Sequence, residues 1–340
     1  MQEATYSELL QVVLGGEHLT RPQTHWAFGQ IMDGAWSEAQ IAGLLVALAA
    51  RKEGVEEIAG AAEAMREHVL RIDTGGADVI DTCGTGGTHL STLNVSTAVA
   101  LVLAGGGVKV AKHGNRTNTR ASGSADVLTA LGVNINADAD VVARCLAEAN
   151  VCFCFAVRCH PAMKYAMPVR KALGVRTIFN LLGPLTNPAG AKRQLMGVFD
   201  AGLTETIAAV LGALGSEHAM VVHAADGLDE ISCTCETKVS QWRAGRVSTR
   251  TIAPEDFGMK RSSMSDLLVA SPEESAAAIG NVLAGKRGPA RDIVLLNAGA
   301  AFVVADRAAD MPEGIVMAAE SIDSGAATEA LAKLIAVSKT

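Results

Sequence analysis

The stretch GTGGTHLSTLNVST at residues 84–97 decides the fold, and KHGNRTNTRASGSAD at residues 112–126 follows it closely. Val79 and Ile80 come just before the first stretch and predict a short buried strand. The apolar run AVALVLAGGG at residues 98–107 comes just after it and predicts a helix that ends at the glycine triplet. A strand, a glycine loop and a helix in this order place backbone N–H groups where an anion can bind.

This stretch is basic, although the chain as a whole is acidic. The protein has 36 Asp and Glu against 29 Lys and Arg, yet residues 82–125 contain neither Asp nor Glu. Residues 149–199 lack them as well. The cations in the two regions are Lys109, Lys112, Arg116 and Arg120, then Arg158, Lys164, Arg170, Lys171, Arg176, Lys192 and Arg193. Two cationic regions predict two anionic groups or substrates, one of them a phosphate; uneven scatter of surface charge is the alternative for each.

Length and composition favour a two-part α/β enzyme. The 340 residues exceed the roughly 250–300 at which single hydrophobic cores stop growing. Hydrophobic residues make up 49% and aromatic residues only 4%, which suits helices packed on a buried, mainly parallel sheet. The start MQEATYSELL does not resemble a secretion signal, and the seven cysteines lack disulfide-domain spacing. We therefore expect a cytoplasmic protein that does not enter a membrane.

The chain divides into a small helical domain and a larger α/β domain. Residues 1–74 show helical periodicity, with capping boxes predicted at Thr20 and Ser37, and residues 77–340 should form the second domain. Strands are expected at 108–111, 151–156, 195–199 and 219–223, with a few antiparallel strands after 231. Helices are expected at 124–131, 137–149, 204–214, 271–286 and from 299 onward. The proline-rich part of 161–190 should fold back onto the N-terminal helices and form a cleft with the sheet domain.

Hydroxyl and amide side chains increase the anion-binding capacity of the glycine loop. GTGGT alone is compatible with an ordinary tight turn, and it is neither a Walker nor a Rossmann motif. Further donors stand where the following helix should begin, namely Thr92, Asn94, Ser96 and Thr97. Several such contacts could hold a pyrophosphate, while simple helix capping by Ser96 or Thr97 is the plainer interpretation.

Three further positions are candidates for chemistry. His113 could act as a general base or simply donate a hydrogen bond, and Asn115 could grip an amine or carbonyl. Arg170 could form two parallel hydrogen bonds with a carboxylate, or it could be a surface charge on a helix. The acidic cluster DGLDE at residues 226–230 follows a predicted strand and suits Mg²⁺, although an Asp-Gly turn is the alternative.

The complete set of motifs resembles the anthranilate phosphoribosyltransferase family. In chain order it comprises GTGG with N-x-S-T, KHGNR with SGSAD, HPAMK, PVRKALGVRTIFNLLGPLTNPA and DGLDE, and the similarity covers essentially the whole chain. The resemblance implies a helical domain joined to a nucleoside-phosphorylase-like α/β domain, and a homodimer formed through the helical domain. It implies transfer of phosphoribose from phosphoribosyl pyrophosphate to the amine of anthranilate, with Mg²⁺ and in tryptophan biosynthesis.

The resemblance also implies roles for individual residues. Donor-binding residues would be Gly84, Gly87, Thr88, Thr92, Asn94, Ser96, Thr97, Lys112, His113, Gly114, Asn115, Arg116, Thr119, Arg120 and Ser124. Anthranilate would contact Gly84, Asn115 and Arg170, and the metal ligands would be Ser96, Asp229 and Glu230.

Several positions depart from the family pattern. Thr88 stands where the family usually has Asp, and Thr119, Arg120 and Ala121 also differ from the usual residues. The loss of a carboxylate beside the pyrophosphate predicts weaker metal organisation, because losses of this kind cost roughly 10- to 100-fold. Arg120 could instead contribute charge to the pyrophosphate directly.

Two other functions fit parts of the pattern. A pyrimidine nucleoside phosphorylase would share the fold, but the DGLDE and PVRKALG segments favour the transferase. A catalytically silent relative could bind nucleic acid through the basic loops, but the net charge of −7 disfavours that function. We therefore expect phosphoribosyl pyrophosphate and anthranilate as ligands, and no nucleic acid.

Overall fold

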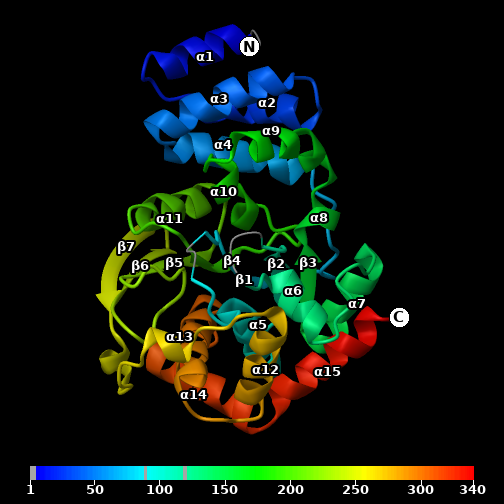
Figure 1. The fold of residues 1–340 in the computed structure, drawn as a ribbon, viewed down its shortest axis with the longest axis vertical. Coiled ribbons are helices and arrows are strands. Elements are labelled where there is room, and N and C mark those ends of the chain that lie inside the picture. The colour runs from blue at the N-terminus through cyan, green and yellow to red at the C-terminus, as the bar shows by residue number, and fades with distance from the viewer. Residues whose placement is uncertain (1–4, 88–89, 118–120) are drawn as a thin grey trace.

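The computed structural model describes residues 5–87, 90–117 and 121–340, and the chain begins with four helices (Figure 1). These are α1 (Tyr6–Leu14), α2 (Arg21–Met32), α3 (Glu38–Arg51) and α4 (Val55–Glu67). Both predicted capping boxes are present, because the Thr20 and Ser37 hydroxyls accept hydrogen bonds from the backbone three residues later. A third capping box, at Thr5, was not predicted.

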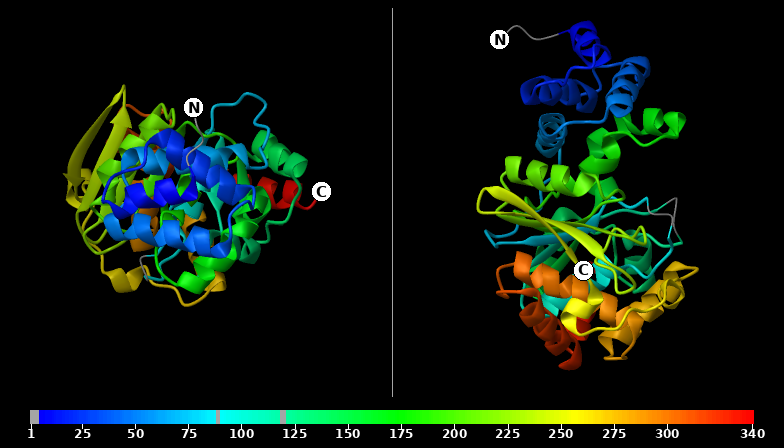
Figure 2. Two further views of the ribbon diagram at one scale, coloured as in Figure 1. Left: turned by 90° about the horizontal axis from the view of Figure 1, so that it is seen from above. Right: turned by 90° about the vertical axis from the view of Figure 1, so that its left-hand side faces the viewer.

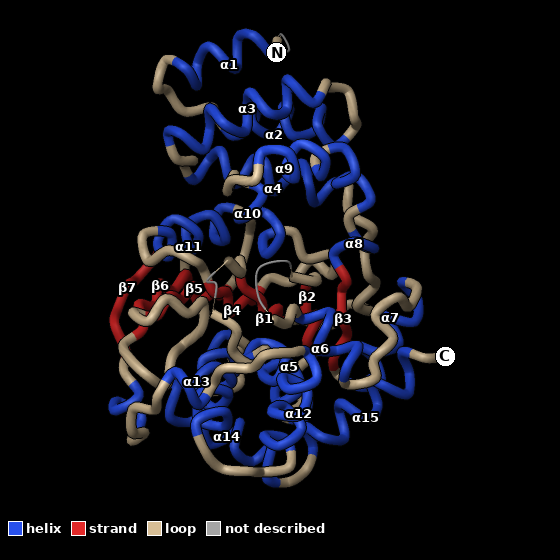
Figure 3. Tube along the Cα trace, in the orientation of Figure 1, coloured by secondary structure: helices blue, strands red, loops and turns tan. Residues whose placement is uncertain are grey.

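A seven-stranded sheet forms the centre of the molecule (Figure 3). Its strands are β1 (Ile80–Gly84), β2 (Val110–Gly114), β3 (Val151–Phe155), β4 (Arg193–Gly197), β5 (His218–Ala224), β6 (Thr237–Arg243) and β7 (Arg246–Ile252). The strand order is β3-β2-β1-β4-β5-β6-β7, with parallel pairing from β3 to β5 and antiparallel pairing beyond β5. The predicted α/β fold with a mainly parallel sheet is therefore confirmed.

Helices cover both faces of the sheet (Figures 1 and 2). The helices that follow β1 in the chain are α5 (Val95–Gly105), α6 (Ser124–Ala130), α7 (Ala139–Ala149), α8 (Ala156–Cys159), α9 (Met167–Leu173), α10 (Phe179–Leu182), α11 (Leu203–Ala213), α12 (Pro272–Leu283), α13 (Pro289–Val304), α14 (Met311–Asp323) and α15 (Ala326–Ser338). No described helix is both long and apolar enough to span a bilayer.

Side-chain alternation along β5 separates two hydrophobic cores. Val221 packs into a core shared with α11 and the N-terminal helices, whereas its neighbours Met220 and Val222 belong to the opposite core. That second core contains α5, α13 and α15, which lie on the far side of the sheet in Figure 1. Successive side chains of a strand point to opposite faces, so one strand supplies both cores.

The segment between β3 and β4 connects the helical part of the molecule to the edge of the sheet. Its helix α9 packs against α3, and a 3₁₀ helix at Pro161–Tyr165 packs against α2. Val169 of α9 is buried in the same core as Leu44 and Leu48 of α3. This packing places α9 beside the N-terminal helices and above the sheet, as Figure 1 shows.

Two local predictions were wrong. Helix α5 begins at Val95, so Ser96 and Thr97 lie in its first turn and Asn94 occupies the N-cap position without a side-chain cap bond. A hydroxyl-rich stretch before an apolar run does not distinguish these positions. The helix expected from residue 299 begins at Pro289, where proline at the first position was an unused start signal.

Candidate active site

A cavity of about 880 Å³ opens at the carboxyl ends of the parallel strands. Gly84 and Gly114 end β1 and β2, and the segments that follow β4 and β5 contribute Phe199 and Asp229 to the lining. The chain leaves β1 toward β2 and β3, and later returns on the other side of β1 through β4 and β5. Ligands of open α/β sheets bind at such a switch point, so topology alone favours this cavity.

Most of the predicted site residues meet in this cavity. Its lining includes Gly84, Gly87, Asn94, Ser96, Lys112, His113, Gly114, Asn115, Arg116, Ser124, Arg170, Asp229 and Glu230. Thr92 and Thr97 do not line it, because both side chains are buried in the protein. Thr88, Thr119 and Arg120 lie outside the described residues.

Asp229 holds the glycine loop in place. The Gly86 amide donates to Oδ2 of Asp229 at 3.1 Å. A Cβ atom on Gly84 would lie 2.6 Å from that oxygen, and a Cβ on Gly197 would lie 1.7 Å from the Asp229 carbonyl oxygen. Glycine is thus required at 84 and 197 for close approach, and at 86 and 87 for positive φ angles of 65° and 82°.

Lys112 connects β2 to the start of α5. Its ammonium donates to Ser96 Oγ at 3.0 Å and to the Thr82 carbonyl oxygen, while the side chain is almost fully buried. Burial lowers the pKa of Lys112, and the charge of Asp81 opposes that shift. The ammonium and the hydroxyl therefore reach the cavity as one fixed group beside the N-terminus of α5.

Asn94 organises the loop that follows β2. Its Oδ1 atom accepts hydrogen bonds from the hydroxyls of Ser122 at 2.7 Å and Ser275 at 2.8 Å. Its Nδ2 atom donates to the Ser122 carbonyl oxygen at 3.1 Å. Asn94 thus ties the basic loop to α12, a role that the sequence did not reveal because Ser275 is 181 residues away.

His113 belongs to a buried pair of imidazoles. Its Nε2 atom lies 3.1 Å from Nε2 of His160, and the ring also bonds the backbone of Gly183. Burial and the neighbouring His160 lower the pKa of His113 to about 3, and burial lowers the pKa of His160 to about 4. Both rings are therefore neutral near pH 7, and the contacts of His113 are with protein groups.

Arg170 projects from α9 on the opposite side of the cavity. Its guanidinium lies 5.4 Å from the centre of the Phe179 ring and contacts Met167, and among the described residues it has no ion-pair partner. Burial lowers its pKa, yet an arginine remains charged at neutral pH. A planar cation without a protein carboxylate suits an incoming carboxylate.

The DGLDE segment, residues 226–230, contains three acidic residues with two different roles. One is held by hydrogen bonds within the protein, and the other two line the cavity. Hydrogen bonds from Ser232 and Thr234 fix Asp226; burial acts against ionisation, but these bonds lower its pKa overall. Asp229 and Glu230 reach the cavity and are the only carboxylates among its described lining residues.

These two carboxylates fit magnesium better than a metal held by protein alone. No group of three or more His, Cys, Asp or Glu side chains in the described parts of the chain could hold a metal ion. Mg²⁺ commonly uses one or two carboxylates together with substrate phosphates and water. Asp229 and Glu230, with the Ser96 hydroxyl at the same cavity, provide that kind of donor set.

Some lining residues were not predicted as site residues. Arg176 donates to the Gly87 carbonyl oxygen at 2.6 Å and stacks 4.1 Å above the centre of the Phe199 ring. Lys171 and Asn180 also line the cavity. Arg176 and Lys171 belong to the acid-free stretch 149–199, but the sequence could not show which of its cations line the cavity.

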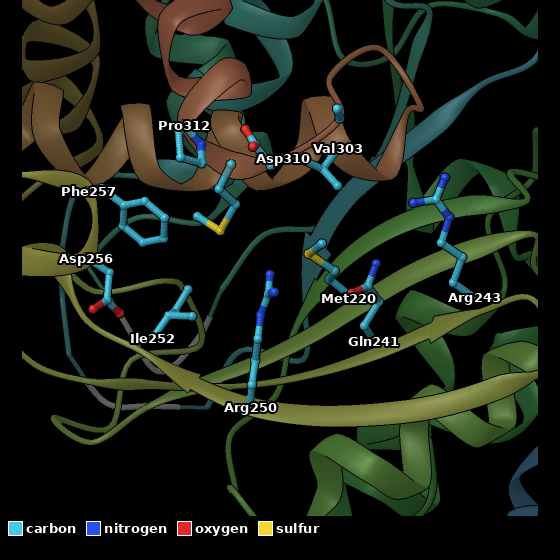
Figure 4. Close-up of a pocket in the computed structure, with 12 residues that line it drawn as sticks. Met220, Gln241, Arg243, Arg250, Ile252, Asp256, Phe257, Val303, Asp310 and Pro312 are labelled. Atoms are coloured by element: carbon cyan, nitrogen blue, oxygen red, sulfur yellow. The ribbon is translucent and has the colours of Figure 1, made fainter.

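A second cavity, of about 370 Å³, lies between β7 and the start of α14 (Figure 4). Arg250 extends into it from β7, opposite Asp310 and Pro312. Its two carboxylates are already used, because Asp310 caps α14 and Asp256 accepts from the Ala253 amide. None of the predicted site residues lines this cavity, so the first cavity remains the candidate active site.

Comparisons with known proteins agree with this geometry. The glycosyl transferase family matches through its helical bundle domain at residues 7–69 and its a/b domain at residues 76–328. Anthranilate phosphoribosyltransferase of Thioalkalivibrio sulfidiphilus is 50% identical over 335 residues, which cover 98% of each chain.

Solved structures extend the comparison to three dimensions. Anthranilate phosphoribosyltransferase of Thermus thermophilus matches with a TM-score of 0.93 and 40% identity, covering 98% of this chain and 99% of that one. The Saccharomyces cerevisiae enzyme matches in its complex with PRPP and Mg, with a TM-score of 0.88, 29% identity and 99% of each chain covered. Its complex with 4-fluoroanthranilate gives a TM-score of 0.88 at 27% identity, again over 99% of each chain. With this identity along its whole length, the chain belongs to the anthranilate phosphoribosyltransferase family.

Proposed function

We propose that the chain transfers phosphoribose from phosphoribosyl pyrophosphate to the amine of anthranilate, and releases pyrophosphate, in tryptophan biosynthesis. The observation that carries the proposal is one cavity in which the glycine loop, the Lys112–Arg116 segment and the Asp229–Glu230 pair face Arg170. Its described lining holds two carboxylates and five cations, Lys112, Arg116, Arg170, Lys171 and Arg176. Such a cavity favours substrates that carry several negative charges.

The donor is proposed to bind along the glycine loop and the start of α5. The loop at Gly84–Gly87 and the Lys112 ammonium, with the Ser96 hydroxyl, would surround the pyrophosphate. The segment from His113 to Arg116 and Ser124 would complete the site. Thr92 and Thr97, whose side chains are buried, would support the site without lining it, and Thr88, Thr119 and Arg120 remain proposed donor contacts.

Magnesium is proposed to bind at Asp229 and Glu230, with Ser96 near one ion. The Mg complex of the yeast relative with PRPP supports this assignment. When bound, Mg²⁺ would offset negative charge on the departing pyrophosphate. The hydrogen bond from Gly86 to Asp229 places the carboxylate next to the loop that would hold that pyrophosphate.

The acceptor is proposed to bind between α9 and the loop after β2. Arg170 would hold the carboxylate of anthranilate, and Asn115 and Gly84 would contact the same substrate from the sheet side. The complex of the yeast relative with 4-fluoroanthranilate supports an aromatic acceptor of this class.

Positioning and electrostatic stabilisation would supply most of the rate enhancement. The amine would displace pyrophosphate at the anomeric carbon through an oxocarbenium-like transition state, in which cations and amides stabilise the leaving group. An aniline nitrogen is already a competent nucleophile. No strong base is needed, and His113, with a pKa of about 3, would serve as a neutral hydrogen-bonding group.

The quaternary and domain arrangement is proposed as well. Leu14 and Val46, on the N-terminal helices, are 70% and 46% exposed, which suits a homodimer formed through the helical domain. We propose that residues 1–74, with part of 161–190, close as one unit over residues 77–340. Light scattering with and without phosphoribosyl pyrophosphate would test the dimer, and small-angle scattering would test the closure.

Anthranilate fluorescence tests the activity itself. The fluorescence should fall when phosphoribosyl pyrophosphate is added with Mg²⁺, and should fall much more slowly without Mg²⁺. Persistent fluorescence in both mixtures would contradict the proposal. Phosphate-dependent release of uracil or thymine would indicate a nucleoside phosphorylase instead, and salt-sensitive retention of nucleic acid without turnover would indicate a silent relative.

A further inference from the structure

The glycine loop presents carbonyl oxygens as well as amides, and a carbonyl oxygen repels an anion. Gly87 has a φ of 82°, so its backbone takes a conformation that turns the chain sharply next to the cavity. Its carbonyl oxygen accepts a hydrogen bond from Nη2 of Arg176 at 2.6 Å. The cation thus neutralises the part of Gly87 that would oppose a bound diphosphate.

Arg176 is closely fitted to this position. A Cβ atom on Gly87 would lie 3.1 Å from Nη2 of Arg176, so the guanidinium packs directly against the glycine. Its other side stacks 4.1 Å from the centre of the Phe199 ring, just beyond β4. The Phe199 ring contacts the face of the guanidinium, and the Gly87 carbonyl oxygen accepts a hydrogen bond from its edge. A lysine ammonium is not planar and could not make both contacts in this way.

The segment that carries Arg176 comes from the acceptor side of the cavity. Helix α9 ends at Leu173, and Gly174 turns the chain with a φ of 63° toward Arg176. The same helix carries Arg170 and is held against α3 by Val169. Arg176 therefore joins the helix proposed to hold anthranilate to the loop proposed to hold the donor.

We propose that Arg176 is a positioning residue for donor binding, which acts by fixing the Gly87 carbonyl oxygen in addition to the charge that it brings to the cavity. The assignment rests on the proposed donor site. Arg176 is not among the donor-binding residues that the family resemblance implies, and the comparisons give it no role. Loss of the contact should weaken the donor and leave acceptor binding nearly unchanged.

Steady-state kinetics and calorimetry of Arg176→Ala test this role. We expect KM for phosphoribosyl pyrophosphate to rise about tenfold, with kcat and KM for anthranilate within about twofold of wild type. The melting temperature should change little, because Arg176 is exposed. Arg176→Lys should give an intermediate rise, since it keeps the charge but not the stacked, edge-on geometry.

Two further variants separate positioning from charge. Lys171→Ala removes a cation from the same side of the cavity and should raise KM for the donor much less than Arg176→Ala. Phe199→Leu removes the stacking surface, should raise the same KM by about threefold, and should add nothing in the Arg176→Ala background. Equal effects of Arg176→Ala and Lys171→Ala, or an unchanged donor KM in Arg176→Ala, would overturn the inference.

Failure of the proposed function would look different. If the wild-type protein does not consume anthranilate, the catalytic proposal fails whatever the variants do. Calorimetric titration with phosphoribosyl pyrophosphate and Mg²⁺ still compares donor affinity between wild type and Arg176→Ala in that case. A tenfold weaker affinity in the variant supports the role of Arg176, and equal measurable affinities overturn it.

Discussion

Gly84 and Asp229 lie so close that the glycine hydrogen occupies the only space between them: a Cβ atom on Gly84 would be 2.6 Å from Oδ2 of Asp229. One residue ends β1 and the other follows β5, so the contact crosses the switch point of the sheet. It brings the proposed donor loop and the proposed metal ligand together in one rigid unit.

Gly84→Ala should therefore displace the Asp229 carboxylate and weaken the response to magnesium. We expect the Mg²⁺ concentration for half-maximal activity to rise at least tenfold, measured by titration of the metal at saturating substrates. Gly280→Ala is the matched control, because a Cβ there meets nothing within 4 Å in α12. Unchanged magnesium dependence in Gly84→Ala would show that the contact does not orient a ligand.

Asp229→Asn keeps the shape of the side chain and removes its charge. We expect metal affinity to fall roughly 10- to 100-fold and kcat at fixed Mg²⁺ to fall with it, while the melting temperature stays near that of wild type. Asp140→Asn, at an exposed position of α7, provides the comparison for loss of a carboxylate outside the cavity. Wild-type magnesium affinity in Asp229→Asn would remove this residue from the metal site.

Arg170→Ala should weaken the acceptor more than the donor. The guanidinium lines the cavity and forms no ion pair with a carboxylate of the described residues, so its loss leaves the acceptor carboxylate unpaired. We expect KM for anthranilate to rise at least tenfold and KM for the donor to change by less than threefold. Arg144→Ala, in an exposed pair with Glu148, should alter neither value. An equal rise in both KM values would mean that Arg170 has a different partner.

Protonation of the buried histidines should make stability depend on pH. The pKa values of His113 and His160, about 3 and about 4, lie below the ordinary 6.5, so the unfolded chain binds protons that the native chain excludes. Their contribution to stability is complete above pH 6.5 and is lost as the pH falls toward 4 and then 3. Urea unfolding at about pH 7 and pH 5 should show a smaller loss of stability in His160→Gln than in wild type. An identical loss would contradict the assigned pKa shift of His160.

Asn94→Ala should reduce stability as well as donor binding. The hydroxyls of Ser122 and Ser275 would lose their shared acceptor, and an unsatisfied buried group costs about 1–3 kcal/mol. We expect a loss of about 2 kcal/mol in the free energy of unfolding, measured with urea. Asn281→Ala, at an exposed position of α12, should cost much less. A loss confined to donor binding would mean that Asn94 serves only the ligand.

The order of elements could be predicted because each local signal agrees with the fold. Short apolar runs flanked by glycine gave the parallel strands, and the polar residues just after those runs gave most of the cavity lining. Parallel strands place their carboxyl ends at one edge of the sheet, so residues such as Gly84, His113 and Asp229 meet without any signal that links them directly.

Long-range side-chain contacts could not be predicted in the same way. Nothing near Arg176 in the sequence indicates Gly87 as its partner, because the contact spans 89 residues and depends on how α9 packs against the N-terminal helices. The pairing of His113 with His160 likewise depends on the fold. Thr97 was misplaced for a local reason, since hydroxyls at an N-cap and in a first helical turn look alike in sequence.

A crystal structure of the protein soaked with phosphoribosyl pyrophosphate and Mg²⁺ tests the central claim most directly. We predict the diphosphate between the Gly84–Gly87 loop and Lys112, with a metal ion within about 2.1 Å of oxygens from Asp229 or Glu230. A fully ordered ligand elsewhere, or those two carboxylates turned away from a metal that is bound, would contradict the claim.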